Sequence, residues 1–179
     1  MMVLHPDQCP SWSVPHGYFP GKWEERSLNI QYDPEGKYLE HRAEIVASLG
    51  LDVQRIVFSN QVHGTVVHVI GTDLPDVTLE GDGLVTNVPG VTLGVYTADC
   101  APVLFWDTYG AIGVCHAGWK GSLYGILEKT VQKIRSISCH PHRIQACIGP
   151  TIRKQHYEVS SDFYTTFTTE DPKSADFFH

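Results

Sequence analysis

Residues 97–121 read TADCAPVLFWDTYGAIGVCHAGWKG and hold two apolar runs with a turn between them. Cys100 stands directly before the first run, and His116 stands directly after the second. The turn residues 107–110 join the runs, a pattern that predicts a hairpin or a pair of neighbouring strands. We therefore expect the Cys100 thiol and the His116 imidazole to meet near the same end of a sheet.

Three helices are predicted around this stretch. The first has Asp33 as N-cap, Pro34 at its first helical position and Gly50 as its stop. The second extends from about Gly118 to Ile137, where apolar residues recur at helical spacing. A third helix is expected within the Thr-rich residues 160–169.

Short β-branched runs bounded by turn residues predict strands at 55–59, 65–70, 83–87, 91–96, 103–106, 111–115 and 143–148. The order of these elements predicts an α+β (mixed α/β) fold, with mixed β-sheets packed against helices. The chain has 179 residues, 42% of them hydrophobic, which is enough for one domain with its own core. We expect residues 1–179 to form that single domain.

Composition excludes several classes of protein. The net charge of −7 argues against a general nucleic-acid binder, because neutralising phosphates needs a basic surface. No apolar run reaches the length of a membrane span, and the N-terminus lacks a signal pattern. The five cysteines form no CxxC pair, so we expect no disulfide framework and a cytoplasmic location. Cys115, inside an apolar run, is expected to be a buried small hydrophobe.

Three candidate metal ligands, His63, Cys100 and His116, stand at the predicted ends of strands. A His/Cys/His trio fits a zinc site with three protein ligands and an open fourth position for water. Such a site permits hydrolytic chemistry, because bound water becomes far more acidic. Two other interpretations stay open: Cys100 as a nucleophile with His116 as its base, or three ordinary strand-end residues.

Further polar residues are candidates for binding substrate or moving protons. Lys120 adds positive charge to the predicted helix N-terminus, and Gly118 leaves room for an anion. This combination suits a phosphate-binding site, and it also suits a tight turn with no ligand. Asn60 and Gln61 can recognise a base or sugar, or bond to the backbone. Asp99 can orient a ligand, transfer a proton or cap a turn. The catalytic candidates are Cys100, His116, Asp99 and Lys120, and the substrate-binding candidates are Asn60, Gln61, Lys120 and Gly118.

Four motifs follow one another along the chain: NQVHG at 60–64, DGLVT at 82–86, TADCAPV at 97–103 and HAGWKG at 116–121. Together they resemble the successive motifs of the YfiH-like family. That group is labelled multicopper polyphenol oxidase or laccase, and was later described as purine nucleoside phosphorylase. The resemblance covers most of the chain and implies a YfiH-like domain.

The resemblance implies a zinc ion held by His63, Cys100 and His116. It also implies phosphorolysis of adenosine, inosine, guanosine and S-methyl-5'-thioadenosine, with adenosine deamination as a second activity. The expected partners are therefore purine nucleosides and phosphate, with no nucleic acid and no membrane. Copper is the minor alternative to zinc. A copper-dependent polyphenol oxidase is the distant alternative, because one such trio cannot supply several coppers.

The resemblance also sets an expectation for the end of the chain. Members of the family usually continue for some tens of residues, with a Cys-Thr motif and an Arg-bearing Ser-Tyr-Arg segment. This sequence ends at His179 without them, so we expect it to lack the usual C-terminal segment. A non-catalytic zinc-binding remnant is therefore a further alternative to an enzyme.

Overall fold

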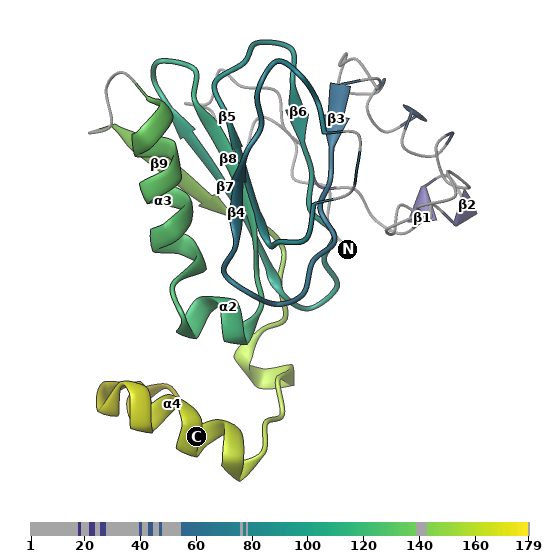
Figure 1. The fold of residues 1–179 in the computed structure, drawn as a ribbon. Helices are drawn as coiled ribbons and strands as arrows, with labels where there is room; N and C mark the ends of the chain where they lie inside the picture. Colours follow the sequence, from purple (N-terminus) through teal and green to yellow (C-terminus); the bar gives the residue numbers. More distant parts are fainter. Residues whose placement is uncertain are drawn as a thin grey trace.

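The computed structural model centres on a five-stranded sheet with the strand order β4-β5-β8-β7-β9 (Figure 1). It describes residues 55–75, 77, 79–138 and 143–178, with scattered positions before residue 55. The strands are β4 (Val67–Val69), β5 (Gly83–Thr86), β7 (Ala101–Asp107), β8 (Ile112–Ala117) and β9 (Ile144–Ile148). β4 and β5 run parallel and the other neighbours run antiparallel, so the predicted mixed α/β class is confirmed.

β7 and β8 form the predicted hairpin, in a register that pairs Pro102 with His116. The Asp107 carboxylate stabilises the turn, because its Oδ1 accepts hydrogen bonds from the backbone amides of Tyr109 (2.8 Å) and Ala111 (3.0 Å). Both strands are longer than predicted, since their pairing continues beyond the apolar runs. The end of the hairpin opposite the turn carries His116 and the cysteine that precedes β7.

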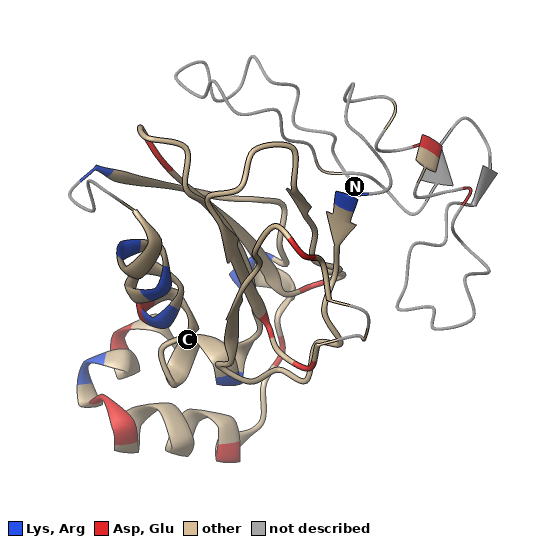
Figure 2. Ribbon diagram, turned by 45° about the horizontal axis from the view of Figure 1, so that its top comes forward, with Lys and Arg blue, Asp and Glu red and all other residues tan. Residues whose placement is uncertain are grey.

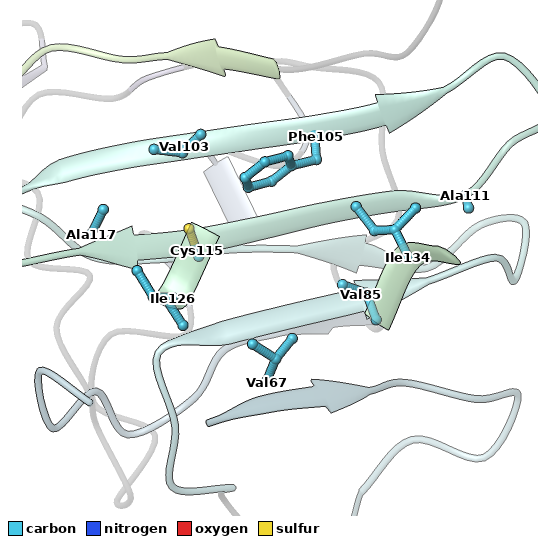
Figure 3. Packing of buried hydrophobic residues seen from close by; sticks show 9 residues of the cluster. All are labelled: Val67, Val85, Val103, Phe105, Ala111, Cys115, Ala117, Ile126 and Ile134. Carbon is cyan, nitrogen blue, oxygen red and sulfur yellow. The ribbon is translucent and has the colours of Figure 1, made fainter. Parts of the chain in front are cut away.

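Helix α3 (Ile126–Ile137) covers one face of the sheet (Figures 1 and 3). Its residues Ile126, Thr130 and Ile134 recur every fourth position and are buried. Full burial of each isoleucine contributes about 1.5–3 kcal/mol. Cys115 lies in this core, fully buried as predicted, and burial raises the pKa of its thiol to about 12. The core cluster comprises Val67, Val85, Val103, Phe105, Ala111, Cys115, Ala117, Ile126 and Ile134.

The opposite face of the sheet packs against a second, smaller sheet. Its two parallel strands are β3 (Ile56–Val57) and β6 (Thr92–Leu93), shorter than the predicted runs because only these two residue pairs meet. Leu84 and Val114 point to this face, since side chains alternate along each strand. The resulting cluster comprises Val57, Ile70, Leu84, Val91 and Val114.

The predicted continuous helix from Gly118 to Ile137 is wrong, because the structure divides it. α2 (Trp119–Leu123) ends after five residues, and α3 begins at Ile126. Between them Gly125 has a φ of 87°, in the left-handed region that glycine occupies without strain. The apolar stripe continues across the break, which is why periodicity alone did not reveal it.

The basic residues of α3 mark its outer side (Figure 2). Lys129, Lys133 and Arg135 are all exposed. Lys129 Nζ donates a hydrogen bond to Thr65 Oγ1, so the helix is also tied to the loop that precedes β4. That loop carries His63, and α3 therefore helps to position one side of the candidate site.

Most of the predicted first helix lies outside the described residues, including Asp33, Pro34 and Gly50. The described positions of that segment are helical: Glu40, Ala43, Glu44 and Ala47. Nearer the N-terminus, strand β1 (Lys22–Trp23) pairs antiparallel with β2 (Arg26–Ser27).

The C-terminal part contains the predicted third helix, α4 (Ser161–Glu170), between the short helices η3 (Lys154–His156) and η4 (Pro172–Phe177). Ser160 caps α4 by accepting a hydrogen bond from the amide of Phe163 (3.3 Å). α4 lies away from the sheet, beyond α2 (Figure 1). None of the described helices is both long enough and apolar enough to span a membrane.

Candidate metal centre

His63, Cys100 and His116 converge at the open end of the β7–β8 hairpin, and we call them the ligand trio. Their ligand atoms all lie within 4.8 Å of one another. Cys100 Sγ is 3.9 Å from His63 Nε2, and the two imidazole rings meet edge to face with centroids 4.7 Å apart. Tetrahedral ligands bound at about 2.0–2.3 Å from one ion lie roughly 3.3–3.8 Å apart, so the trio needs only a small contraction to hold a metal.

The hairpin and one loop deliver the three side chains. Cys100 precedes β7, and the hydroxyl of Thr97 donates to its backbone oxygen, which stabilises the TADC turn. His116 lies in β8 with only 3% of its surface exposed. His63 comes from the loop before β4 and is exposed, so the trio is open to solvent on one side. The predicted meeting of Cys100 and His116 at one end of a sheet is confirmed.

Asp82 holds this arrangement together, although the sequence analysis did not single it out as a site residue. It is completely buried and its carboxylate accepts hydrogen bonds from the amides of Val62 (3.1 Å), His63 (3.0 Å) and Gly64 (2.7 Å). The same carboxylate lies 2.8 Å from His116 Nδ1. One buried acid thus supports two of the three candidate ligands.

These hydrogen bonds fix the orientation of both histidines. With Nδ1 of His116 directed at Asp82, its Nε2 remains available to a metal, the usual arrangement of a carboxylate behind a ligating histidine. His63 has a φ of 59°, a left-handed conformation that is uncommon for a residue with a side chain. The Asp82 bonds to the amides around it stabilise that conformation. The sequence signal for Asp82 is its position between two glycines, directly before a buried strand.

Gly118 forms the close-packed floor beneath the trio. A methyl group there would lie 2.8 Å from His63 Cδ2, 3.4 Å from Cys100 Sγ and 3.5 Å from His116 Cε1. The contact with His63 is too short for a side chain at this position, whereas the other two are ordinary van der Waals distances, so glycine lets the chain pass close to His63.

Gly118→Ala is expected to lower metal affinity about tenfold while leaving the protein folded. The backbone of Gly118, at φ −69° and ψ 165°, suits alanine, so the cost arises from the contact with His63 alone. Metal competition with a chromogenic chelator measures the affinity. Gly71→Ala is the matched control, because nothing lies within 4 Å of the methyl group it adds. Equal affinities in the two variants would contradict the expectation.

The other predicted site residues differ in their contacts. The Gln61 amide bonds to the backbone of Tyr96, accepting from its N–H (2.7 Å) and donating to its oxygen (2.8 Å). Asn60 forms a backbone bridge with Glu80 at the base of the same loop. Asp99 is exposed directly beside Cys100.

Lys120 lies on the outer side of α2, with its Nζ 5.3 Å from the centroid of the Trp119 ring. The side chain is exposed. Because α2 has only five residues, it supplies one short turn of helix instead of the long helix N-terminus that was expected beside the trio. The positive charge near Gly118 therefore comes chiefly from the lysine.

The electrostatics of Cys100 favour a metal ligand over a free nucleophile. Burial raises the pKa of its thiol, and the negative charges of Asp99 and Asp82 raise it further. Reactive cysteines instead have a pKa lowered by neighbouring positive groups. A bound metal ion deprotonates a coordinating thiol directly. A metal would therefore stabilise the Cys100 thiolate that the two acids disfavour.

The fold and the trio define a class of mixed α/β protein with three candidate metal ligands at the end of a β-hairpin. Residues 16–179 match the family described as multi-copper polyphenol oxidoreductase laccase. The chain belongs to this family, and the YfiH-like resemblance is confirmed.

Known relatives carry names of two kinds of purine enzyme. A purine nucleoside phosphorylase of Deinococcus radiodurans is 38% identical over 168 residues, which cover 89% of this chain and 65% of that protein. Adenosine deaminase RL5, from an unknown prokaryotic organism, is 34% identical over 140 residues, covering 73% of this chain and 53% of the relative.

Solved structures share the fold. Bacillus licheniformis YfiH aligns with a TM-score of 0.68 and 30% identity, over 77% of this chain and 56% of that one. Neisseria meningitidis NMB0706 aligns with a TM-score of 0.69 and 33% identity, over 84% and 61%. The chain thus spans less than two thirds of the length of each of these four relatives.

Proposed function

We propose that this chain acts as a zinc-dependent purine nucleoside phosphorylase, with adenosine deamination as a second activity. The observation that carries the proposal is the solvent-open ligand trio with Asp82 behind it. The names of the relatives in Deinococcus radiodurans and of RL5 support the two reactions. Because the chain spans only part of those proteins, turnover by this chain is itself part of the proposal.

The donor set supports zinc. One thiolate and two imidazoles are ligands that zinc commonly takes, with a fourth position left for water or substrate. Bound there, zinc would acidify water and polarise a substrate oxygen. Asp82 would keep the His116 tautomer that presents Nε2 to the ion.

The neighbouring polar residues would bind and orient the substrate. Lys120 is assigned to phosphate, as an exposed cation two residues after Gly118. Asp99, exposed beside Cys100, is assigned to proton transfer. Asn60 is assigned to the base or sugar, and Gln61 supports the loop through its two bonds to Tyr96 while keeping one amide proton for substrate.

The decisive experiment pairs metal analysis with a nucleoside assay. We expect about one zinc per chain and release of hypoxanthine from inosine only when phosphate is present, with ribose 1-phosphate as the second product. In that reaction the bond from C1' to the base breaks and a bond from C1' to a phosphate oxygen forms. Release without phosphate would contradict phosphorolysis, and no release by fully zinc-loaded protein would favour the non-catalytic alternative.

Deamination is tested separately. Adenosine in phosphate-free buffer should yield inosine and ammonia if the site activates water toward the purine ring. The same preparation loaded with copper and offered a phenol tests the oxidase alternative, whose positive result would be oxygen uptake. Thiol alkylation that abolishes turnover in metal-free protein would instead favour Cys100 as a nucleophile.

A further inference from the structure

An aromatic group adjoins the ligand trio without taking part in it. Trp119 follows Gly118, where an added methyl group would lie within 3.5 Å of all three ligands, and the Trp119 ring centroid lies 5.0 Å from that of Phe163 in α4. Tyr157 meets Phe163 edge to face, with centroids 5.9 Å apart. We call Trp119, Tyr157 and Phe163 the aromatic wall.

The wall is tied to the trio from two directions. Trp119 is joined through Gly118 at the floor of the site. On the other side, Thr151 Oγ1 and the amide of Ile152 donate to the backbone oxygen of Asp99 at 2.6 and 3.0 Å. The segment that leads to Tyr157 is therefore bound to the residue before Cys100. The short helix η3 then ends at His156, with Tyr157 as its C-cap. The rings are therefore held beside the site by hydrogen bonds and packing.

The wall lies outside the two core clusters, although Trp119 and Phe163 are partly buried and also pack against Phe167. Tyr157 is 42% exposed, and none of the described residues of α4, 161–170, is buried. Burial raises the pKa of Tyr157, and the negative charges of Cys100 and Asp99 raise it further, which agrees with a phenol close to the trio. A ring as exposed as that of Tyr157, beside a candidate metal site, can accept the flat face of a ligand.

We propose that the aromatic wall binds the purine base of the nucleoside by stacking, chiefly through Tyr157 and Trp119. This inference rests on the proposed function, because it names the part of that site that recognises the base. Aromatic rings stack on bases of any sequence, which fits a site that accepts adenosine, inosine and guanosine alike. Lys120, already packed against Trp119, lies at the same edge and can offer its charge to the phosphate.

The test measures adenosine binding directly, by calorimetry on zinc-loaded protein without phosphate. Tyr157→Ala should weaken binding about tenfold, whereas Tyr157→Phe, which keeps the ring, should bind within about twofold of the parent protein. Trp119→Leu should weaken binding similarly. Tyr109→Ala is the matched control, because this exposed tyrosine lies in the turn at the far end of the same hairpin. Zinc content and far-ultraviolet circular dichroism should be unchanged in Tyr157→Ala.

The outcomes separate this inference from the proposed function. Unchanged affinity in Tyr157→Ala at full zinc content, or no binding of adenosine by the parent protein, overturns the aromatic wall. If Tyr157→Ala binds adenosine weakly and the parent protein binds it but never releases base, the wall is supported and phosphorolysis is overturned. Where turnover is present, KM should rise in Tyr157→Ala with little change in kcat, since stacking contributes equally to ground state and transition state.

Discussion

Changing Cys100 to alanine is expected to reduce bound zinc from about one ion per chain to near zero. The thiolate is the charged member of the trio, and the two imidazoles that remain are neutral ligands. Elemental analysis after dialysis against a weak chelator measures the loss. Phosphate-dependent base release should disappear with the metal.

The matched control is Cys147→Ala, which removes another partly buried thiol from strand β9 of the same sheet. This variant should keep its zinc, because Cys147 is outside the ligand trio. Full zinc occupancy in Cys100→Ala would remove Cys100 from the metal site. Loss of zinc in both variants would point to general unfolding, which a thermal melt identifies.

Asp82→Asn is expected to lower zinc affinity about 10–100-fold. Asp82 Oδ1 accepts from His63 and His116, while Oδ2 accepts from Val62 and Gly64. An asparagine amide replaces one of these oxygens with a donor, so whichever way it turns, two donors lose their acceptor. Unfolding free energy should fall by about 2–4 kcal/mol, because these groups are left unpaired in a buried position.

Asp107→Ala separates metal affinity from stability, because Oδ1 alone accepts both turn hydrogen bonds and an asparagine oxygen would keep them. Asp107 is also completely buried and also accepts two backbone amides, but it lies in the turn at the opposite end of the hairpin. Its variant should be less stable while binding zinc with the parental affinity. Chelator competition and thermal unfolding of both variants provide the comparison. A parental zinc affinity in Asp82→Asn would show that the carboxylate supports the fold without supporting the metal site.

The parts of the structure that could be predicted from sequence are those encoded by neighbouring residues. The turn at 107–110 and the two apolar runs beside it specify the β7–β8 hairpin, and that hairpin brings Cys100 to His116. The burial of Cys115 follows from its place within an apolar run. The cap at Ser160 likewise lies within a few residues of the helix that it starts.

The parts that could not be predicted depend on pairing across the chain. Asp82 reaches His63 and His116 only because β5 lies between β4 and β8. The break at Gly125 was hidden because one glycine in a helix costs only about 1 kcal/mol, which packing often offsets. The contact of Trp119 with Phe163 joins α2 and α4, and the apolar pattern of neither helix predicts that they pack together.

The single carboxylate shared by the His63 loop and strand β8 makes the two ligands energetically coupled. A substitution that displaces the loop changes how the Asp82 carboxylate can bond to His116. A change at His116 in turn changes how much of the carboxylate's negative charge the loop amides must balance. Effects at contacting positions of this kind do not add. The loop and the strand are therefore expected to evolve together. A substitution in the His63 loop is tolerated or not according to the residue present in β8, and the reverse also holds.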